Sequence, residues 1–210
     1  MIFFALLIAT SFGAIYGVDI STLHEVYHFQ CMIENGFTFV IPRCYCSVGC
    51  MDDNCAQNMI NAKNAGMSRV DPYFFPCFSC GNVAGQVSSY YKELITYQVQ
   101  PERTWFDVEG EWSSSYSTNQ AFLMEMVNQA RYIGFVHGIY CNYNYWTYFF
   151  GYDYTFPYHS ETQVWYAIYD YTPSFDGWDQ FGGWTYPNIK QYAGNQQFCD
   201  GWVDYNYQEL

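Results

Sequence analysis

The sequence repeats a strand-then-helix pattern from near its start. Short apolar runs, typical of strands buried on both faces, alternate with segments in which apolar residues recur at helical spacing. The runs 15–20, 37–41, 70–75, 104–109 and 135–141 predict five strands, and the segments 22–36, 53–66, 85–97 and 118–132 predict helices between them. Because a helical connection between parallel strands is right-handed and packs back on the sheet, this repetition predicts a parallel sheet covered by helices.

The last third of the sequence departs from this pattern. Residues 164–169, 189–192 and 203–207 predict three more strands, but the segments between them lack long helical periods. Five strand–helix units followed by three strands predict an irregular α/β barrel of eight strands in a single domain. A complete barrel of this kind takes about 250 residues, so missing helices account for a chain of 210. The alternative is an open doubly wound sheet, although no Gly-x-Gly-x-x-Gly phosphate loop follows any strand.

The charge balance excludes two classes of partner. Seven Lys and Arg residues stand against twenty Asp and Glu residues, for a formal net charge of −13. Nucleic acids and anionic membranes require a cationic surface, so we expect neither as a partner. Any other anionic polymer would also be repelled over long range at neutral pH, and this repulsion would relax as carboxylates protonate. We therefore expect a secreted protein or one that works in an acidic, lysosome- or phagosome-like compartment. The alternative is that the negative charge serves only to keep the protein soluble.

The start of the sequence predicts export. Residues 1–15 form an apolar stretch followed by small residues, as in a signal peptide cleaved near Gly13 or Ala14. A membrane anchor is the alternative, but a bilayer-crossing helix needs about 20 apolar residues, and this block ends at Asp19. No linker, charge block or repeat interrupts residues 16–210. We expect these residues to form one domain, and the protein to be a monomer free of the membrane after cleavage.

Nine cysteines fit the prediction of export, because disulfides persist in oxidising compartments. Zinc binding and redox activity are the alternatives, but the sequence contains only four scattered histidines. An odd count leaves at least one thiol free, and Cys44 and Cys141, each beside a hydrophobic run, are the candidates. The sequence does not determine which cysteines pair in disulfides. His24 and His28 have the spacing of a metal-binding pair without an evident third ligand, so we expect surface residues and no metal or other cofactor.

Four carboxylates fall at predicted strand ends, where barrel enzymes place their reacting groups. Asp107 and Glu109 are two apart on one strand, so both leave the same face, with Cα atoms about 6.5 Å apart. Asp19 ends the first strand and Asp204 the last, and barrel closure makes those strands neighbours. In glycoside hydrolysis one carboxyl protonates the leaving oxygen while another stabilises positive charge at the anomeric carbon. The alternatives are Asp19 as a turn or cap residue and Asp204 as an ordinary surface acid.

Several segments around these acids occur in the order and at the intervals typical of one enzyme family. These segments are Gly17–Ser21, Trp105–Glu109, Val164–Ala167, Gln191–Tyr192 and Val203–Asn206. Together they resemble the glycoside hydrolase family 25 lysozymes, the Chalaropsis-type muramidases. The cysteine-rich second loop and the segment Pro76–Gly81 resemble the branch found in unicellular eukaryotes and invertebrates. The resemblance runs from about Tyr16 to the C-terminus.

The resemblance implies a (β/α)5β3 barrel that hydrolyses the β-1,4 bond between N-acetylmuramic acid and N-acetylglucosamine in bacterial peptidoglycan, without a metal. Glu109 falls on the family's general acid and Asp107 on its partner carboxylate. Asp19 and Asp204 fall on two further acids of the cleft. The resemblance also implies retention of configuration, with either Asp107 or the substrate's own acetamido group as the nucleophile.

Aromatic and polar residues near the strand ends are candidates for substrate binding. They are Tyr73, Tyr140, Trp165, Trp184, Arg43 and Gln191. Tyr73, Tyr140 and Trp165 match family positions, although packing is the stronger interpretation of Trp165. Trp184 follows two glycines in a loop, where sugar stacking and loop packing are equally compatible with the sequence. Arg43 is placed to meet the muramyl carboxylate or peptide stem, or to pair with an acid of the cleft.

Two other functions are compatible with a barrel of this kind. A barrel-type chitinase would show a longer Asp-x-x-Asp-x-Asp-x-Glu run, which is absent before Asp107 and Glu109. A catalytically silent, secreted carbohydrate-binding protein would keep the cleft without turnover. Four intact carboxylates disfavour it, because binding alone does not require their mutual repulsion. Antibacterial defence and digestion of bacteria use the same chemistry, so the biological role stays open.

Overall fold

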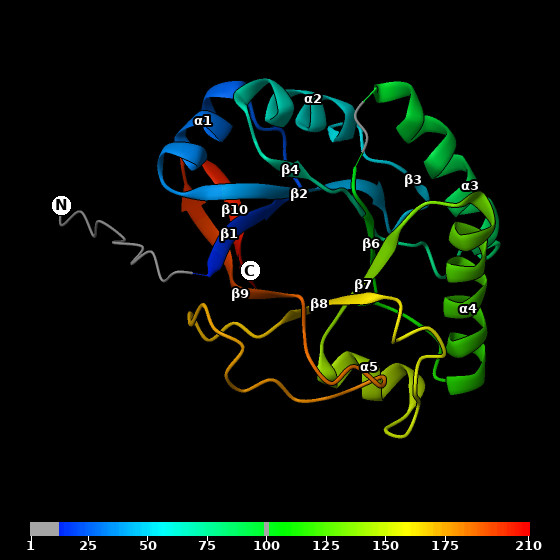
Figure 1. Ribbon diagram of the computed structural model, residues 1–210. Coiled ribbons are helices and arrows are strands. Elements are labelled where there is room, and N and C mark those ends of the chain that lie inside the picture. The colour runs from blue at the N-terminus through cyan, green and yellow to red at the C-terminus, as the bar shows by residue number, and fades with distance from the viewer. Residues whose placement is uncertain (1–12, 99–100) are drawn as a thin grey trace.

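Eight strand positions close into a barrel in the computed structural model, which describes residues 13–98 and 101–210 (Figure 1). The strands of the barrel are β1 (Ala14–Ile20), β2 (Phe37–Cys46), β4 (Arg69–Val70) with β5 (Tyr73–Phe74), β6 (Thr104–Asp107), β7 (His137–Cys141), β8 (Gln163–Ala167), β9 (Ile189–Phe198) and β10 (Gly201–Glu209). They follow the order β1-β10-β9-β8-β7-β6-β5-β2, and parallel pairing of β1 with β2 closes the ring. A short β3 (Cys50–Met51) extends β2 as a hairpin. The predicted barrel is confirmed.

Helices cover the outside of the barrel only where the sequence repeats its strand–helix pattern. They are α1 (Val26–Glu34), α2 (Cys55–Ala65), α3 (Val83–Leu94), continued by a 3-10 turn (Ile95–Tyr97), α4 (Tyr116–Ile133) and α5 (Tyr143–Phe150). Figure 1 shows loops instead of a helix over the stretch between β8 and β9. Pro72 divides the third strand into β4 and β5, as its missing N–H predicts.

The start of the first helix differs from the prediction. The helix begins at Val26, not beside Thr22, and the backbone N–H of Glu25 donates to Nδ1 of His28 at 2.7 Å. His24 and His28, predicted at the surface, are buried, with 1% and 8% of their area exposed. The reason is a tertiary contact, since residues before α1 pack against α2: the backbone N–H of His24 donates to Oδ1 of Asn58 at 2.8 Å.

The direction of the last strand corrects the expectation of a wholly parallel sheet. β10 runs antiparallel to both β9 and β1, because a tight turn at Cys199 and Asp200, both at positive φ, reverses the chain directly after β9. Asp204 therefore lies near the beginning of its strand and not at its end. Reversal brings the beginning of β10 to the end of the barrel where the parallel strands finish, and Asp204 pairs directly with Asp19.

Two apolar layers stabilise the barrel. The larger layer lies between strands and helices, and the smaller one fills the barrel interior with Phe39, Ile41, Tyr73, Trp105, Tyr140, Trp165 and Ile189. Large aromatic rings fit inside the barrel because small residues face them. A Cβ added to Gly138 on β7 would overlap the ring of Trp105 on β6, so this glycine is required for space.

We expect Gly138→Ala to lower the free energy of unfolding by about 1–3 kcal/mol, the usual effect of overpacking a closed core. Urea unfolding followed by tryptophan fluorescence measures it. Ser89→Ala on the exposed face of α3 is the matched control and should leave stability within about 0.5 kcal/mol. Equal stabilities of the two variants would contradict the packing of Trp105 against Gly138.

The cysteines form three disulfides, Cys31–Cys199, Cys44–Cys55 and Cys77–Cys80. The first ties α1 to the β9–β10 turn, and the second ties β2 to the start of α2. Cys46, Cys50 and Cys141 are free. The prediction of a free, buried thiol is confirmed for Cys141 and wrong for Cys44, because the start of α2 brings Cys55 beside it.

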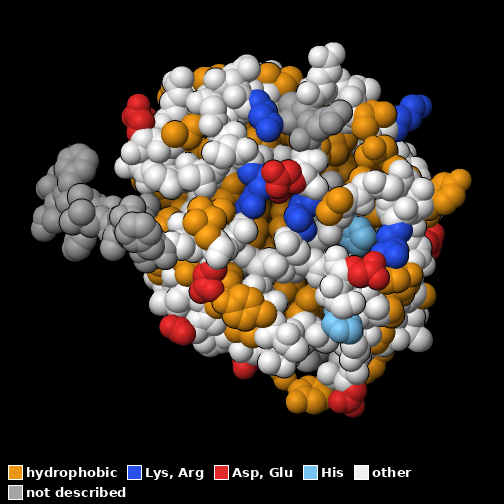
Figure 2. Space-filling model, in the orientation of Figure 1, with side chains coloured by type: hydrophobic (Ala, Val, Ile, Leu, Met, Phe, Trp, Pro, Cys, Tyr) orange, Lys and Arg blue, Asp and Glu red, His pale blue; other side chains and the backbone are white. Residues whose placement is uncertain are grey.

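Most of the predicted signal peptide, residues 1–12, lies outside the described residues, while Ala14 and Ile15 belong to β1 and pair with β10. Among the helices that the structure describes, none is long and apolar enough to cross a membrane. On the face shown in Figure 2, apolar side chains are scattered among polar ones instead of forming one continuous patch.

Candidate active site

The barrel brings the four predicted carboxylates to one end. Asp107 is the last residue of β6, Asp19 precedes the last residue of β1, and Asp204 is paired with Asp19 in the sheet. Beyond β6 the backbone N–H of Val108 donates to the carbonyl of Tyr140 at 2.9 Å, which extends the strand geometry by one residue. Val108 is buried in the outer apolar layer, so Glu109 returns to the side of Asp107.

Gln191 on β9 joins two of these acids. Its side-chain amide donates to Oδ1 and Oδ2 of Asp19 at 2.8 and 3.0 Å, and to Oδ2 of Asp204 at 3.0 Å. Its Oε1 accepts the hydroxyl groups of Tyr140 at 2.7 Å and Tyr169 at 2.9 Å. All polar atoms of this buried amide are therefore satisfied, and the side chain is held in one orientation.

A second amide, Asn206 on β10, supports Asp19 from below. Its Nδ2 donates to Oδ1 of Asp19 at 2.7 Å, and its Oδ1 accepts the indole N–H of Trp165 at 2.7 Å. Trp165 is 2% exposed and its ring lies 4.4 Å from that of Tyr140, centroid to centroid. Trp165 and Tyr140 thus form the floor beneath the carboxylates. This placement agrees with packing as the main role of Trp165.

Burial raises the pKa of all four carboxyl groups, and repulsion by neighbouring carboxylates raises it further for Asp19, Asp107 and Glu109. For Asp107 the largest cause is desolvation, followed by the charges of Glu109 and Asp19, and its pKa lies well above 3.8. The pKa of Asp19 is also raised well above its ordinary value, by desolvation and by Asp204, against hydrogen bonds from Asn206 and Gln191 that lower it. Desolvation and Asp204 raise the pKa of Glu109. The cluster therefore retains protons to a higher pH than exposed carboxyl groups do.

Asp107 is the most isolated of the four acids. Its side chain is 4% exposed, and Oδ1 has no hydrogen-bond partner among the described residues. The positive charge of Arg43 lowers the pKa of Asp107. Arg43 itself is fixed elsewhere, because its Nε donates to Oδ2 of Asp52 at 2.6 Å and its guanidinium donates to the carbonyl of Ser21 at 3.2 Å. Among the four carboxyl groups Arg43 acts on Asp107 through its electric field, while its direct ion pair is with Asp52.

The predicted binding residues are not all in one place. Tyr73 lies inside the barrel, where the charges of Asp107 and Asp19 help to raise the pKa of its buried hydroxyl well above 10.0. Trp184 is a correction to the prediction of a sugar platform: it is 4% exposed, and its indole N–H donates to the carbonyl of Thr162 at 2.7 Å. It packs in the outer layer against Trp146, since the loop folds back over α5.

Sequence reasoning assigned no role to Asn206, Tyr169 or Asn195, although the structure places all three in the carboxylate network. The backbone N–H of Asn195 donates to Oδ1 of Asp204 at 2.6 Å. Asn206 was predictable from its position two residues after Asp204, because alternate residues of a strand point to the same face of the sheet. No group of three or more His, Cys, Asp or Glu side chains in the described parts of the chain is arranged to hold a metal ion.

Comparison with known proteins identifies relatives over nearly the whole chain. A family model described as "Lysozyme-like protein 1" matches residues 10–192. "Probable GH family 25 lysozyme 5" of Dictyostelium discoideum is 36% identical, over 98% of this chain and 95% of that protein. "Lysozyme-like protein 5" of Caenorhabditis elegans is 35% identical, over 91% of this chain and 90% of that protein.

Solved structures share the fold at low sequence identity. The muramidase from Acremonium alcalophilum superposes with a TM-score of 0.73 at 18% identity, over 92% of this chain and 93% of that chain. The autolysin LytC of Streptococcus pneumoniae, solved in complex with a synthetic peptidoglycan ligand, gives a TM-score of 0.71 at 16% identity, over 92% and 46% of the two chains. From the family model and the full-length relatives, the chain belongs to the glycoside hydrolase family 25 lysozymes.

Proposed function

We propose that this protein is a lysozyme that hydrolyses the β-1,4 bond between N-acetylmuramic acid and N-acetylglucosamine in peptidoglycan. The observation that carries the proposal is the cluster of four carboxyl groups at one end of the barrel, each with a raised pKa. Membership in a lysozyme family and structural likeness to muramidases support the same substrate class. No metal or cofactor enters the reaction that we propose.

Glu109 acts as the general acid in this proposal. It is partly exposed beside the buried Asp107, and its raised pKa keeps it protonated until it donates to the leaving oxygen. Asp107 is the ionised partner that stabilises positive charge at the anomeric carbon. The charge of Glu109 raises the pKa of Asp107, so protonation of Glu109 favours ionisation of Asp107, and the field of Arg43 acts in the same direction against the cost of burial.

Asp19, Asp204 and Gln191 position the reacting pair and the sugar. The Gln191 amide holds Asp19 and Asp204 in fixed orientations. Asp19 acts electrostatically on Asp107, and Asp204 acts on Glu109. Fixed carboxylates facing the site also bind sugar hydroxyl groups or water without reorganising during the reaction. In this proposal the main role of Gln191 is to position the two acids, and contact with the substrate is secondary.

We expect Gln191→Leu to reduce kcat on bacterial walls by about 10²-fold with a small change in KM, since misplaced catalytic groups cost about that much. The substitution also removes a hydrogen bond that lowers the pKa of Asp19, so the pH–rate profile should move to higher pH. Gln197→Leu, exposed on the same strand, is the matched control. An unchanged profile and kcat in Gln191→Leu would contradict the positioning role.

Product analysis tests the proposed reaction itself. Defined peptidoglycan digested by the protein should yield fragments that end in reducing N-acetylmuramic acid, identified by mass spectrometry after borohydride reduction. Fragments that end in reducing N-acetylglucosamine would place the cut at the other glycosidic bond and refute the proposal. Binding of glycan without any fragments would favour a silent carbohydrate-binding protein.

We also propose that the protein works outside the cytosol, as a secreted enzyme or in an acidic compartment, for defence against bacteria or their digestion. Three disulfides and the predicted signal peptide support export. The net charge of −13 opposes approach to an anionic wall at neutral pH and weakens as carboxylates protonate.

The pH–rate profile should peak on the acidic side of neutrality. Activity requires a protonated Glu109, so it is lost as the pH rises through the raised pKa of that group. It also requires an ionised Asp107, so it falls again as the pH drops through the raised pKa of that group. Initial rates of wall lysis measured at constant ionic strength give the profile. A maximum well above neutrality would contradict both the compartment and the role of Glu109.

A further inference from the structure

Two free thiols face each other across the hairpin of β2 and β3. Cys46 is the last residue of β2 and Cys50 the first of β3, and the two are direct partners in the antiparallel register (Figure 1). Neither takes part in a disulfide. Cys141, the third free thiol, is fully buried in the outer apolar layer. Cys46 and Cys50 are therefore the one pair of free thiols that the described chain brings together.

The spacing of this pair suits a disulfide. The Cα atoms of direct partners in an antiparallel pair lie about 4.5 or 5.5 Å apart, and their side chains leave the same face of the sheet. Disulfides bridge Cα atoms that lie about 4.4–6.8 Å apart. The turn between the partners is closed by the backbone N–H of Gly49, which donates to the carbonyl of Cys46 at 2.9 Å. A bond between the two sulfur atoms therefore requires rotation of the side chains and little movement of the backbone.

The two thiols differ in their access to solvent, and this difference gives them different roles. Cys50 is exposed beside the turn, where Val48 is also exposed. Cys46 is half-buried, its thiol donates to Oδ2 of Asp52 at 3.5 Å, and burial raises its pKa to about 11. Exchange with a disulfide requires a thiolate that can reach it. Cys50 is therefore placed to meet a dissolved disulfide first, and Cys46 to close the bond afterwards.

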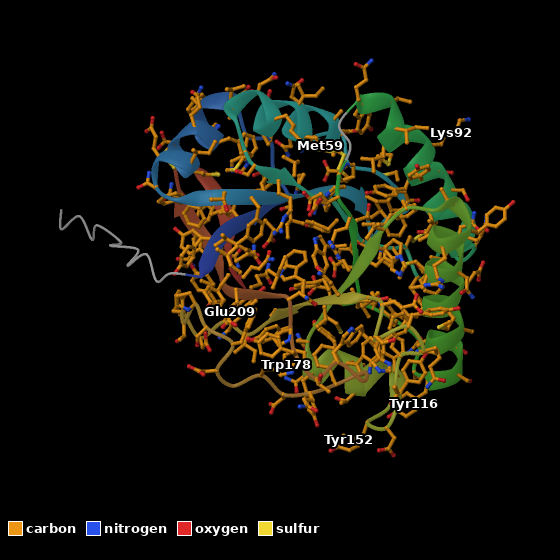
Figure 3. The ribbon with its side chains drawn as sticks, viewed as in Figure 1. Met59, Lys92, Tyr116, Tyr152, Trp178 and Glu209 are labelled. Carbon is orange, nitrogen blue, oxygen red and sulfur yellow. A yellow bond between two sulfur atoms is a disulfide. The ribbon has the colours of Figure 1, made fainter. Side chains whose placement is uncertain are left out.

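Two existing disulfides lie near the hairpin and define the alternatives. Cys44–Cys55 is fully buried, and Sγ of Cys44 lies 3.6 Å from Sδ of Met59, labelled in Figure 3. Cys77–Cys80 lies against the turn, since a Cβ added to Gly49 would come within 3.0 Å of Sγ of Cys80. Exchange of a hairpin thiol with Cys77–Cys80 would leave the number of thiols unchanged. A new bond across the hairpin removes two thiols, so the number of thiols distinguishes the two reactions.

We propose that Cys46 and Cys50 form a fourth disulfide by exchange with a small-molecule disulfide such as glutathione disulfide. The thiolate of Cys50 attacks one sulfur of the oxidant and releases one glutathione. The thiolate of Cys46 then attacks Sγ of Cys50 and releases the second glutathione. The two cysteines lose two electrons and two protons, and the oxidant gains them as two glutathione thiols. This modification site is independent of the reaction at the carboxylate cluster.

The bond would fix the segment that carries Asp52. Asp52 follows Cys50 by two residues, and its backbone N–H donates to the carbonyl of Cys44 at 3.0 Å. Oδ2 of Asp52 accepts both the thiol of Cys46 at 3.5 Å and Nε of Arg43 at 2.6 Å. Oxidation removes the hydrogen of that thiol and leaves this oxygen to Arg43. The disulfide then holds together the hairpin from which Asp52 positions the guanidinium group.

The number of thiols after oxidation tests the proposal. The protein is incubated with glutathione disulfide, desalted, and unfolded in guanidinium chloride that already contains iodoacetamide, so that thiols are alkylated before they can exchange. Mass spectrometry of unreduced peptides identifies the labelled cysteines. We expect one labelled cysteine, Cys141, and a peptide in which Cys46 is joined to Cys50. Labelling of all three free cysteines, or a disulfide that joins Cys50 to Cys77 or Cys80, would overturn the proposal.

Two single substitutions separate the roles of the thiols. In Cys46→Ser no second thiol displaces the bound glutathione, so Cys50 should retain one glutathione in a mixed disulfide. In Cys50→Ser the exposed thiol is absent, and Cys46 should remain free and be labelled together with Cys141. Cys141→Ala is the matched control and should leave no labelled cysteine after oxidation. Glutathione retained on Cys50 of the unaltered protein, or equal incorporation into Cys46→Ser and Cys50→Ser, would overturn the proposed exchange.

Discussion

Replacing Glu109 with Gln should reduce hydrolysis of bacterial walls by about 10²–10⁴-fold, the contribution expected of a general acid. The amide has the shape of the carboxyl group but has no proton to give to the leaving oxygen. Folding should be retained, because Glu109 lies beyond the end of β6 and is only partly buried. The loss should appear in kcat, measured as the initial rate of release of soluble fragments at saturating substrate.

Glu111→Gln is the matched control for this experiment. It makes the same chemical change two residues further along, at an exposed position. Its activity should equal that of the unaltered protein. Undiminished wall hydrolysis by Glu109→Gln would remove the central assignment, whatever the control shows. Retained glycan binding by Glu109→Gln distinguishes a loss of chemistry from a loss of folding.

Asp107→Asn should reduce kcat by about 10²–10³-fold, since it removes a preorganised charge that stabilises the transition state. The same substitution should stabilise the fold at neutral pH. The pKa of Asp107 in the folded protein lies well above 3.8, so its contribution to stability is present at low pH and is lost as the pH rises. The Asn variant carries no such charge, and its advantage in free energy of unfolding should therefore grow from pH 4 to pH 7.

Urea unfolding at several pH values measures this second effect. Asp53→Asn, at an exposed position before α2, is the control and should show little difference at any pH. A lower stability of Asp107→Asn at neutral pH would contradict the description of Asp107 as a buried and repelled carboxylate. A substitution that lowers activity and raises stability is expected where a protein keeps mutually repelling groups for its function.

The candidate site was predictable where it depends on local geometry. Asp107 and Glu109 share a face because side chains alternate along a strand, and this holds wherever the strand lies. Tyr140 and Trp165 were expected near strand ends, and both lie beneath the carboxylates. Trp184 was not predictable, because its burial depends on how the loop before β9 folds over α5. A glycine-flanked tryptophan looks the same in a sequence whether it faces a sugar or the core.

By itself the sequence determined the alternation of strands and helices and the pairing of Asp107 with Glu109 on one face. These features depend on residues a few positions apart, whose geometry is set by backbone conformation. Only the tertiary structure decided the antiparallel direction of β10 and the contacts of Gln191 and Asn206 with Asp19. Those contacts join residues 172 and 187 positions apart, and closure of the barrel alone brings such distant positions together.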